Sequence, residues 1–207
     1  GPRTFLGATP ERLVGLRGRE VTTMALAGSA ARGEDEAADA RLAAALLDSD
    51  KEREEHAVVV AMIAEALAPV AQGLAMPRRP RVVRYRHVQH LLTPISGRLI
   101  EDADVLTLVE RLHPTPAVGG TPRRLALELI AEEEAHERGW YAGPLGWVDR
   151  HGDGEFVVGL RAGVIKDDEV TLFAGSGIVA DSDPDREWEE SATKLLALGS
   201  ALGRIDG

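Results

Sequence analysis

The sequence contains no cysteine, and its 207 residues include only three Phe, three Trp and two Tyr. Without cysteine the chain has no disulfide, no thiolate metal site and no thiol nucleophile. No apolar run approaches the ~20 residues that span a bilayer, and the first residues show no signal-peptide pattern. We therefore expect a cytoplasmic location and no membrane partner.

Basic residues are also scarce relative to acidic ones. Lys and Arg total 24 against 34 Asp and Glu, which gives a formal net charge of −10. Phosphate backbones demand clustered basic residues, so this balance argues against nucleic acid as a partner. The chain is 44% hydrophobic and 28% charged, a globular composition. We expect a monomer.

Strand and helix patterns alternate irregularly along the chain. Apolar patterns bounded by turns predict strands at 5–7, 12–16, 21–27, 81–86, 91–93, 155–165 and 169–174. Helical periodicity predicts helices at 36–47, 51–70, from Asp102 or Asp104 to 112, from Thr121-Pro122 to about 138, and from about 184 to 202. Because no regular strand-helix repeat occurs, the pattern favours an α+β layered fold over a doubly wound parallel sheet.

Two helices each carry a pair of carboxylates one turn apart. Glu52 and Glu55 begin the helix at 51–70, and Glu55 shares a face with apolar residues such as Val59. Glu187 and Glu190 lie in the last helix, opposite a stripe that contains Trp188. Taken alone, each pair is typical of a solvated helix face. Together the two pairs could hold a hard cation such as Mg²⁺, which takes one or two protein carboxylates.

Two further features admit both a structural and a functional interpretation. Arg161 is expected in the middle of an apolar strand, where it needs a ligand carboxylate or a structural glutamate as partner. Gly175-Ser176-Gly177 could form a backbone nest for an anion, although a plain turn is the default for such a sequence.

Several segments, in order along nearly the whole chain, resemble the chorismate-utilising enzymes. The segments are 5–13 (FLGATPERL), 26–29 (LAGS), 50–56 (DKEREEH), 90–93 (HLLT), 112–120 (LHPTPAVGG), 141–147 (YAGPLGW), 160–161 (LR), 173–179 (FAGSGIV) and Glu187-x-x-Glu190-x-x-x-Lys194. The resemblance implies part of the family's four-layer αββα sandwich. It also implies that residues 1–207 are the C-terminal portion of one chorismate-binding catalytic domain.

The resemblance assigns roles to particular residues. It implies Glu11 as the general acid for the departing C4 hydroxyl of chorismate. Glu55 and Glu190 are implied as Mg²⁺ ligands, with Glu52 and Glu187 as supporting or alternate ligands. The residues implied to bind or line the substrate pocket are Gly28, Ser29, His90, Tyr141, Arg161, Gly175, Ser176, Gly177 and Lys194.

Within the family, 113–120 and 25–29 look most like isochorismate synthases of the menaquinone and siderophore pathways. The resemblance therefore implies Mg²⁺-dependent conversion of chorismate to isochorismate by water. Salicylate synthase and anthranilate synthase component I are the alternatives, and a catalytically dead remnant that still binds Mg²⁺ and a dicarboxylate is the non-enzymatic one. Ala27 disfavours the aminodeoxychorismate type, which carries Lys there in members that use a covalent nucleophile.

The chain also departs from the family in length, since whole members are about twice as long. The lysine that activates water in isochorismate and salicylate synthases lies upstream of the Glu11 motif and is not in these residues. We therefore expect the isolated chain to be inactive.

Overall fold

The strands of this protein form two antiparallel sheets in a computed structural model that describes residues 2–100 and 102–203. The larger sheet has the order β4-β6-β3-β2-β8-β7, with β5 also paired to β6, and the smaller has the order β1-β9-β10. The strands are β1 (Arg3–Gly7), β2 (Arg12–Arg17), β3 (Glu20–Ala31), β4 (Ala71–Ala75), β5 (Arg81–Arg84), β6 (Val88–Leu99), β7 (Pro144–Val148), β8 (Gly154–Val158), β9 (Ala162–Lys166) and β10 (Glu169–Phe173).

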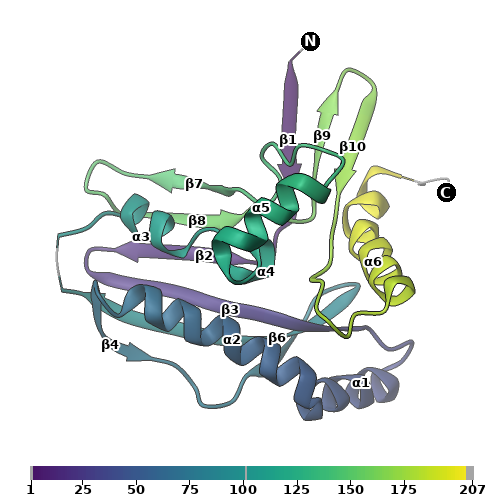
Figure 1. Cartoon of the computed structure of the whole chain (residues 1–207), viewed down its shortest axis with the longest axis horizontal. Coiled ribbons are helices and arrows are strands. Elements are labelled where there is room, and N and C mark those ends of the chain that lie inside the picture. Colours follow the sequence, from purple (N-terminus) through teal and green to yellow (C-terminus); the bar gives the residue numbers. More distant parts are fainter. Residues whose placement is uncertain (1, 101, 204–207) are drawn as a thin grey trace.

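The helices are α1 (Glu36–Asp48), α2 (Asp50–Leu67), α3 (Val105–Leu112), α4 (Pro116–Gly119), α5 (Arg123–Glu133) and α6 (Pro184–Leu202). α2 lies along β3, and α3 packs against β2 and α2 on the same face of the larger sheet (Figure 1). The smaller sheet projects from one end of the larger one, with α6 beside β10 (Figure 1). In the described part of the chain, no helix combines the length and the apolarity that crossing a bilayer requires.

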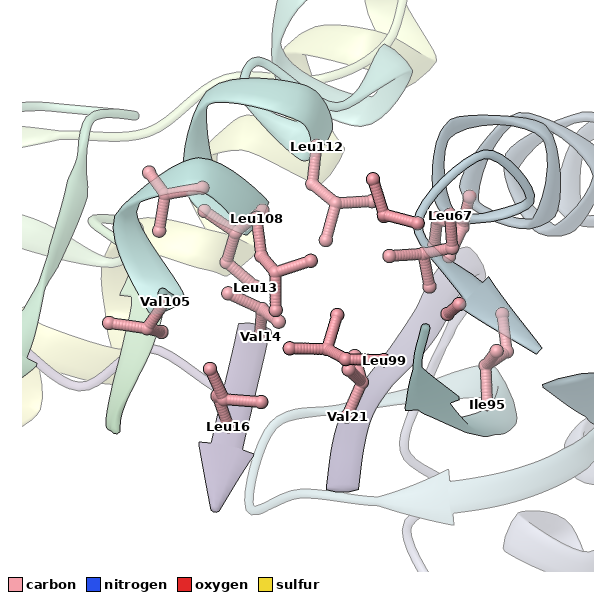
Figure 2. Close-up of a cluster of buried hydrophobic side chains, with 14 of the residues drawn as sticks. Leu13, Val14, Leu16, Val21, Leu67, Ile95, Leu99, Val105, Leu108 and Leu112 are labelled. Atoms are coloured by element: carbon pink, nitrogen blue, oxygen red, sulfur yellow. The ribbon is translucent and has the colours of Figure 1, made fainter. Parts of the chain in front are cut away.

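The hydrophobic core fills the space between this face of the sheet and helices α2 and α3. Figure 2 shows Leu13 and Val21 of the sheet meeting Leu67 of α2 and Leu108 and Leu112 of α3. All five side chains are buried. Burying side chains of this size contributes roughly 1.5–3 kcal/mol each, so the core fixes α2 against β3 and thereby places the first turn of α2.

The predicted α+β class is confirmed, and three predicted helix starts carry the expected caps. The side chains of Ser49, Asp104 and Asp183 accept hydrogen bonds from backbone N–H groups in the first turns of α2, α3 and α6. The side chain of Thr121 does not cap α5. Pro122 keeps an extended ψ of 134°, so the helix begins at Arg123 without a side-chain cap.

The prediction of one strand over 155–165 is wrong. β8 ends at Val158 in the larger sheet, and β9 begins at Ala162 in the smaller one. Between them Arg161 has a φ of +47°, a left-handed conformation that turns the chain from one sheet to the other. Arg161 therefore lies at the junction of the two sheets and not inside a strand.

Candidate active site

The carboxylates of α2 and α6 meet at Ser29, near the end of β3. The backbone N–H of Ser29 donates to Oε2 of Glu52 at 3.2 Å, and its hydroxyl donates to Oε1 of Glu190 at 3.2 Å. Two glutamates from helices more than a hundred residues apart in sequence thus converge on one residue. This juxtaposition unites the two acid pairs that the sequence places on separate helices.

A bulge in β3 makes this convergence possible. The register of β3 on β6 shifts between Ala27, opposite Leu91, and Ser29, opposite His90. Gly28 lies in the bulge with a φ of +79°, and a Cβ there would lie 3.0 Å from Oε2 of Glu52. A side chain would be both strained and crowded against the carboxylate, so glycine is required at this position.

The side chain of His56 in α2 is hydrogen-bonded to the same bulge. Its Nδ1–H donates to the carbonyl of Ala27 at 3.1 Å, and the Thr93 hydroxyl donates to Nε2 at 2.7 Å. The ring is buried, and burial lowers the pKa of His56, so the imidazole stays neutral. Both ring nitrogens are satisfied, which fixes the strand relative to the helix that carries Glu52.

Of the four predicted metal ligands, Glu52 and Glu190 contact Ser29, whereas Glu55 and Glu187 contact other residues. The buried stripe of α2 runs through His56 and Val59 in line with Glu52, so the apolar face is rotated from the one predicted through Glu55. Glu55 is half-exposed and lies 3.9 Å from Lys51. Glu187 accepts a hydrogen bond from the Ser182 hydroxyl at 2.8 Å.

The charges of these carboxylates act on one another. Burial raises the pKa of Glu52, and the negative charges of Glu55 and Glu190 raise it further, against lowering by the Ser29 N–H and by Lys51. Carboxylates that destabilise one another's ionised forms favour a cation between them. The described residues contain no group of three or more His, Asp or Glu placed as metal ligands. The oxygens of Glu52 and Glu190 that meet at Ser29 are hard donors of the kind that a hard cation accepts.

Lys194 connects α6 to the glycine-rich segment. Its ammonium lies 2.8 Å from Oε1 of Glu190 and donates to the carbonyl of Gly175 at 3.0 Å. A Cβ on Gly175 would lie 3.4 Å from the Tyr141 hydroxyl. The next residue, Ser176, donates from its hydroxyl to the carbonyl of Glu187 at 3.4 Å. Gly177 is exposed, and a Cβ added to it would have no neighbouring atom within 4 Å.

Arg161 reaches back from the sheet junction to β6. Its guanidinium donates to Nε2 of His90 at 2.7 Å. Burial lowers the pKa of His90 to about 4, and the positive charges of Arg161 and Lys194 lower it further, so the imidazole accepts this bond as a neutral group. A neutral histidine leaves the guanidinium charge uncompensated. The side-chain contacts that Arg161 makes within the described residues are to His90 and Tyr85, so the alternative of a structural glutamate partner is not supported.

Glu11 directly precedes β2 and lies in a crevice among apolar residues that include Leu13 and Val59. It is only 7% exposed, and Oε1 accepts a hydrogen bond from the Thr115 hydroxyl at 3.4 Å. Burial raises the pKa of Glu11 from 4.5 to about 7, against a smaller lowering by Thr115. Glu11 can therefore hold a proton near neutral pH, as a general acid must.

This raised pKa predicts how Glu11→Gln changes stability. Between pH 4.5 and about 7 the folded chain keeps a proton that the unfolded chain releases, so stability falls as pH rises through this range. The expected loss is at most about 3 kcal/mol, since one pKa unit corresponds to about 1.4 kcal/mol. Glutamine stays neutral, so Glu11→Gln should be more stable than wild type at about pH 9 and gain less at about pH 5. Urea unfolding at both pH values measures the difference.

The control is Glu132→Gln, which changes an exposed glutamate near the end of α5. It should show no comparable pH-dependent gain. An equal effect of Glu11→Gln at both pH values would contradict the assignment of a raised pKa to Glu11.

The prediction that the acids of α6 face solvent is wrong. Trp188, assigned to the apolar stripe, is 78% exposed, whereas Glu187 and Glu190 are half-buried. The helix thus turns its acidic side toward Ser29 and its tryptophan away from β10. Helical periodicity gives the pattern of faces but does not say which face the rest of the fold covers.

Sequence reasoning did not single out two side chains of the site. Thr115 donates to the buried Glu11, and its place in the segment 112–120 was the available signal. The Arg161 guanidinium lies over the Tyr85 ring, with 5.4 Å between Cζ and the ring centroid. The Tyr85 and His90 rings are tilted relative to each other, with 5.9 Å between their centroids. No motif pointed to Tyr85, because its role arises only where β5 and the sheet junction meet.

Glu11 is thus buried beside Thr115, Arg161 contacts His90 and Tyr85, and Glu52 and Glu190 meet at Ser29. The family model for chorismate binding enzymes matches residues 1–203. The chain belongs to this family, which confirms the resemblance seen in the sequence.

Several relatives of this chain are named isochorismate synthases. The chain is 50% identical over its full length to the salicylate biosynthesis isochorismate synthase of Pseudomonas aeruginosa, and covers 44% of it. It is 46% identical, over 97% of its length, to isochorismate synthase MenF of Bacillus subtilis, and covers 43% of that protein. The solved structure of the menaquinone-specific isochorismate synthase MenF of Escherichia coli matches with a TM-score of 0.90 at 40% identity, over 98% of this chain and 46% of that one. The chain thus spans about half the length of these relatives.

Proposed function

We propose that a polypeptide of the relatives' full length containing this chain is an isochorismate synthase. It would convert chorismate to isochorismate by adding water at C2 and expelling the C4 hydroxyl as water. The relatives at 46–50% identity carry this name, and Glu11 supplies the observation that supports the proposal most. A carboxylic acid with a pKa near 7 in an apolar crevice suits protonation of a hydroxide leaving group.

Glu11 would act as the general acid in this reaction. Its proton goes to the C4 oxygen as the C–O bond breaks, which leaves a carboxylate on Glu11. The Thr115 hydroxyl donates to the same carboxyl group and would hold its orientation. Val59, in the crevice with Glu11, lies seven residues beyond Glu52 on α2, which corresponds to about 10 Å along the helix axis. The acid and the carboxylate cluster can thus serve opposite parts of one small molecule.

Arg161 and Lys194 would bind the carboxylates of the substrate. The chain carries a net charge of −10, so a dianion needs local positive charge against the overall field. Arg161 is held by the neutral His90 and keeps its charge available. Lys194 lies beside Glu190 and donates to the carbonyl of Gly175.

Mg²⁺ fits the oxygen donors around Ser29. We propose Glu55 and Glu190 as its ligands, with Glu52 and Glu187 in support. The negative charges of Glu55 and Glu190 both raise the pKa of Glu52, a repulsion that a divalent cation would relieve. The ion would supply a further positive charge for an anionic substrate. The side chains contribute position: Ser29 holds Glu52 and Glu190, and Lys194 contacts the same oxygen of Glu190 as the Ser29 hydroxyl does.

Replacing the proposed ligands should weaken Mg²⁺ binding while the fold persists. Glu190→Gln and Glu55→Gln are each expected to lower the affinity for Mg²⁺ roughly 10-fold or more, by analogy with the loss of a charged partner. Calorimetric titration of Mg²⁺ into the full-length polypeptide with chorismate present measures the change. Glu189→Gln and Glu54→Gln are matched controls, since both glutamates are exposed on the same helices. Unchanged isotherms for both ligand variants would return these carboxylates to a solvated-face role.

The function itself is tested by the identity of the product. The full-length polypeptide, incubated with chorismate and Mg²⁺, should yield isochorismate on chromatographic separation. Salicylate, anthranilate with an ammonia source, or unchanged chorismate would each replace the proposal with one of the alternatives.

A further inference from the structure

Arg161 is supported by an aromatic face as well as by a histidine. Its guanidinium carbon lies 5.4 Å from the centroid of the Tyr85 ring, within the range of a cation–π interaction. Burial lowers the pKa of Arg161, while Tyr85 acts against that lowering. Neither Tyr85 nor the neutral His90 carries a charge that would cancel the guanidinium. The pair therefore fixes the direction of Arg161 and leaves its charge for an anion.

Tyr85 is itself held at a defined place after β5. Its backbone N–H donates to the carbonyl of Val88 at 2.9 Å, and its carbonyl accepts from the Arg32 guanidinium at 2.5 Å. The tyrosine hydroxyl lies 3.5 Å from the carbonyl of Pro10, the residue before Glu11. Tyr85 thus contacts both Arg161 and the segment before β2 that contains Glu11.

A buried carboxylate on α1 fixes the residues around Tyr85. Asp39 is 7% exposed and accepts from Arg32 at 2.6 and 3.0 Å, from Arg84 at 3.0 Å and from the Gly33 N–H at 2.9 Å. These donors lower the pKa of Asp39 to about 2, so it stays ionised at working pH. Asp39 therefore binds two neighbours of Tyr85. Arg84 is the preceding residue in the chain, and Arg32 donates a hydrogen bond to the backbone carbonyl of Tyr85.

We propose that Tyr85 is a positioning residue that orients Arg161 toward the substrate carboxylate, and that Asp39 fixes Tyr85 through Arg32 and Arg84. The inference rests on the proposed function, in which Arg161 binds a carboxylate of chorismate. The ring face, not the hydroxyl, carries the effect on Arg161. Tyr85 would thus contribute to substrate affinity without touching the reacting atoms.

The kinetic test compares Tyr85→Leu with Tyr85→Phe in the full-length polypeptide. Leucine removes the ring, and we expect the KM for chorismate to rise about 3- to 30-fold with kcat within about twofold, the range expected for a cation–π contact. Phenylalanine keeps the ring and should restore a KM within about twofold of wild type. Equal KM values for wild type and Tyr85→Leu, or equal losses in both variants, would overturn the inference.

The coupling to Asp39 is tested by combining variants. Asp39→Asn alone should raise the KM, but in the Tyr85→Leu background it should add little, because the ring that Asp39 positions is already gone. Asp48→Asn, at an exposed aspartate of the same helix, is the matched control and should leave the KM unchanged. Fully additive effects of Asp39→Asn and Tyr85→Leu would remove Asp39 from the proposal.

A spectroscopic measurement on the wild-type chain keeps this inference separate from the proposed function. Protons of the Arg161 side chain that lie over the Tyr85 face should resonate upfield of ordinary arginine values in the NMR spectrum. If chorismate is not converted but the upfield shift is present, the function fails while the positioning stands. Arg161 signals at ordinary positions would overturn the positioning even in an active enzyme.

Discussion

Glu11→Gln is expected to lower the rate of isochorismate formation about 10²- to 10⁴-fold in the full-length polypeptide, the usual contribution of a general acid. Glutamine preserves the size of the side chain and can still accept from the Thr115 hydroxyl, but it has no proton to give at neutral pH. Mg²⁺ binding should persist, because the carboxylate cluster around Ser29 contains no part of Glu11. Steady-state rates, with calorimetry of Mg²⁺ as the control, measure the effect.

The pH dependence of the wild-type rate provides a second view of Glu11. An acid must be protonated to act, so kcat/KM should fall as pH rises through about 7, the value to which burial raises the pKa of Glu11. The Thr115 hydroxyl lowers this pKa, so Thr115→Val should move the alkaline limb to higher pH. A limb that does not move in Thr115→Val, together with near wild-type rates for Glu11→Gln, would rule out Glu11 as the acid.

The 207-residue chain by itself is expected to show no measurable conversion of chorismate. The reaction needs a base to take a proton from water, and the described lysines near the site are engaged. Lys194 is paired with Glu190, and Lys51 lies beside Glu55. His90 has a pKa of about 4 and accepts from Arg161, so it is too weak a base at neutral pH. Losing one member of an acid–base pair costs about 10²- to 10⁴-fold in rate.

This expectation is tested by comparing the chain with the full-length polypeptide. Activity should return when the remaining part is supplied, covalently or as a separate piece, and should stay low when the water-activating lysine expected in that part is changed to alanine. The acid in the chain can be checked in parallel through the stability difference of Glu11→Gln. Robust turnover by the 207-residue chain alone would show that the base lies within these residues.

Local signals in the sequence predicted most elements of the fold. Ser49, Asp104 and Asp183 cap their helices because a short polar side chain before an amphipathic run satisfies free N–H groups wherever the helix packs. The hairpin of β9 and β10 likewise follows from the turn at Lys166–Glu169. These features depend on nearest neighbours in sequence, which a sequence pattern records directly.

Features that depend on distant contacts were not predictable in the same way. The segment 155–165 is apolar except for Glu155 and Arg161. A change of sheet with a positive φ at Arg161 has no local signal, because this residue is neither Gly nor Pro. The outward direction of Trp188 depends on where α6 meets β10. The candidate site residues were recognised through family motifs, whereas their convergence on Ser29 required the bulge at Gly28, which only the pairing of β3 with β6 reveals.

The most direct test of water addition driven by an acid is the fate of labelled oxygen. The full-length polypeptide, given chorismate and Mg²⁺ in ¹⁸O-labelled water, should form isochorismate that carries one ¹⁸O at C2, because solvent attacks there and the original C4 oxygen leaves. Mass spectrometry of the separated product reads the label and its position. Isochorismate carrying the ¹⁸O label confirms the account, and unlabelled isochorismate, or no isochorismate at all, contradicts it.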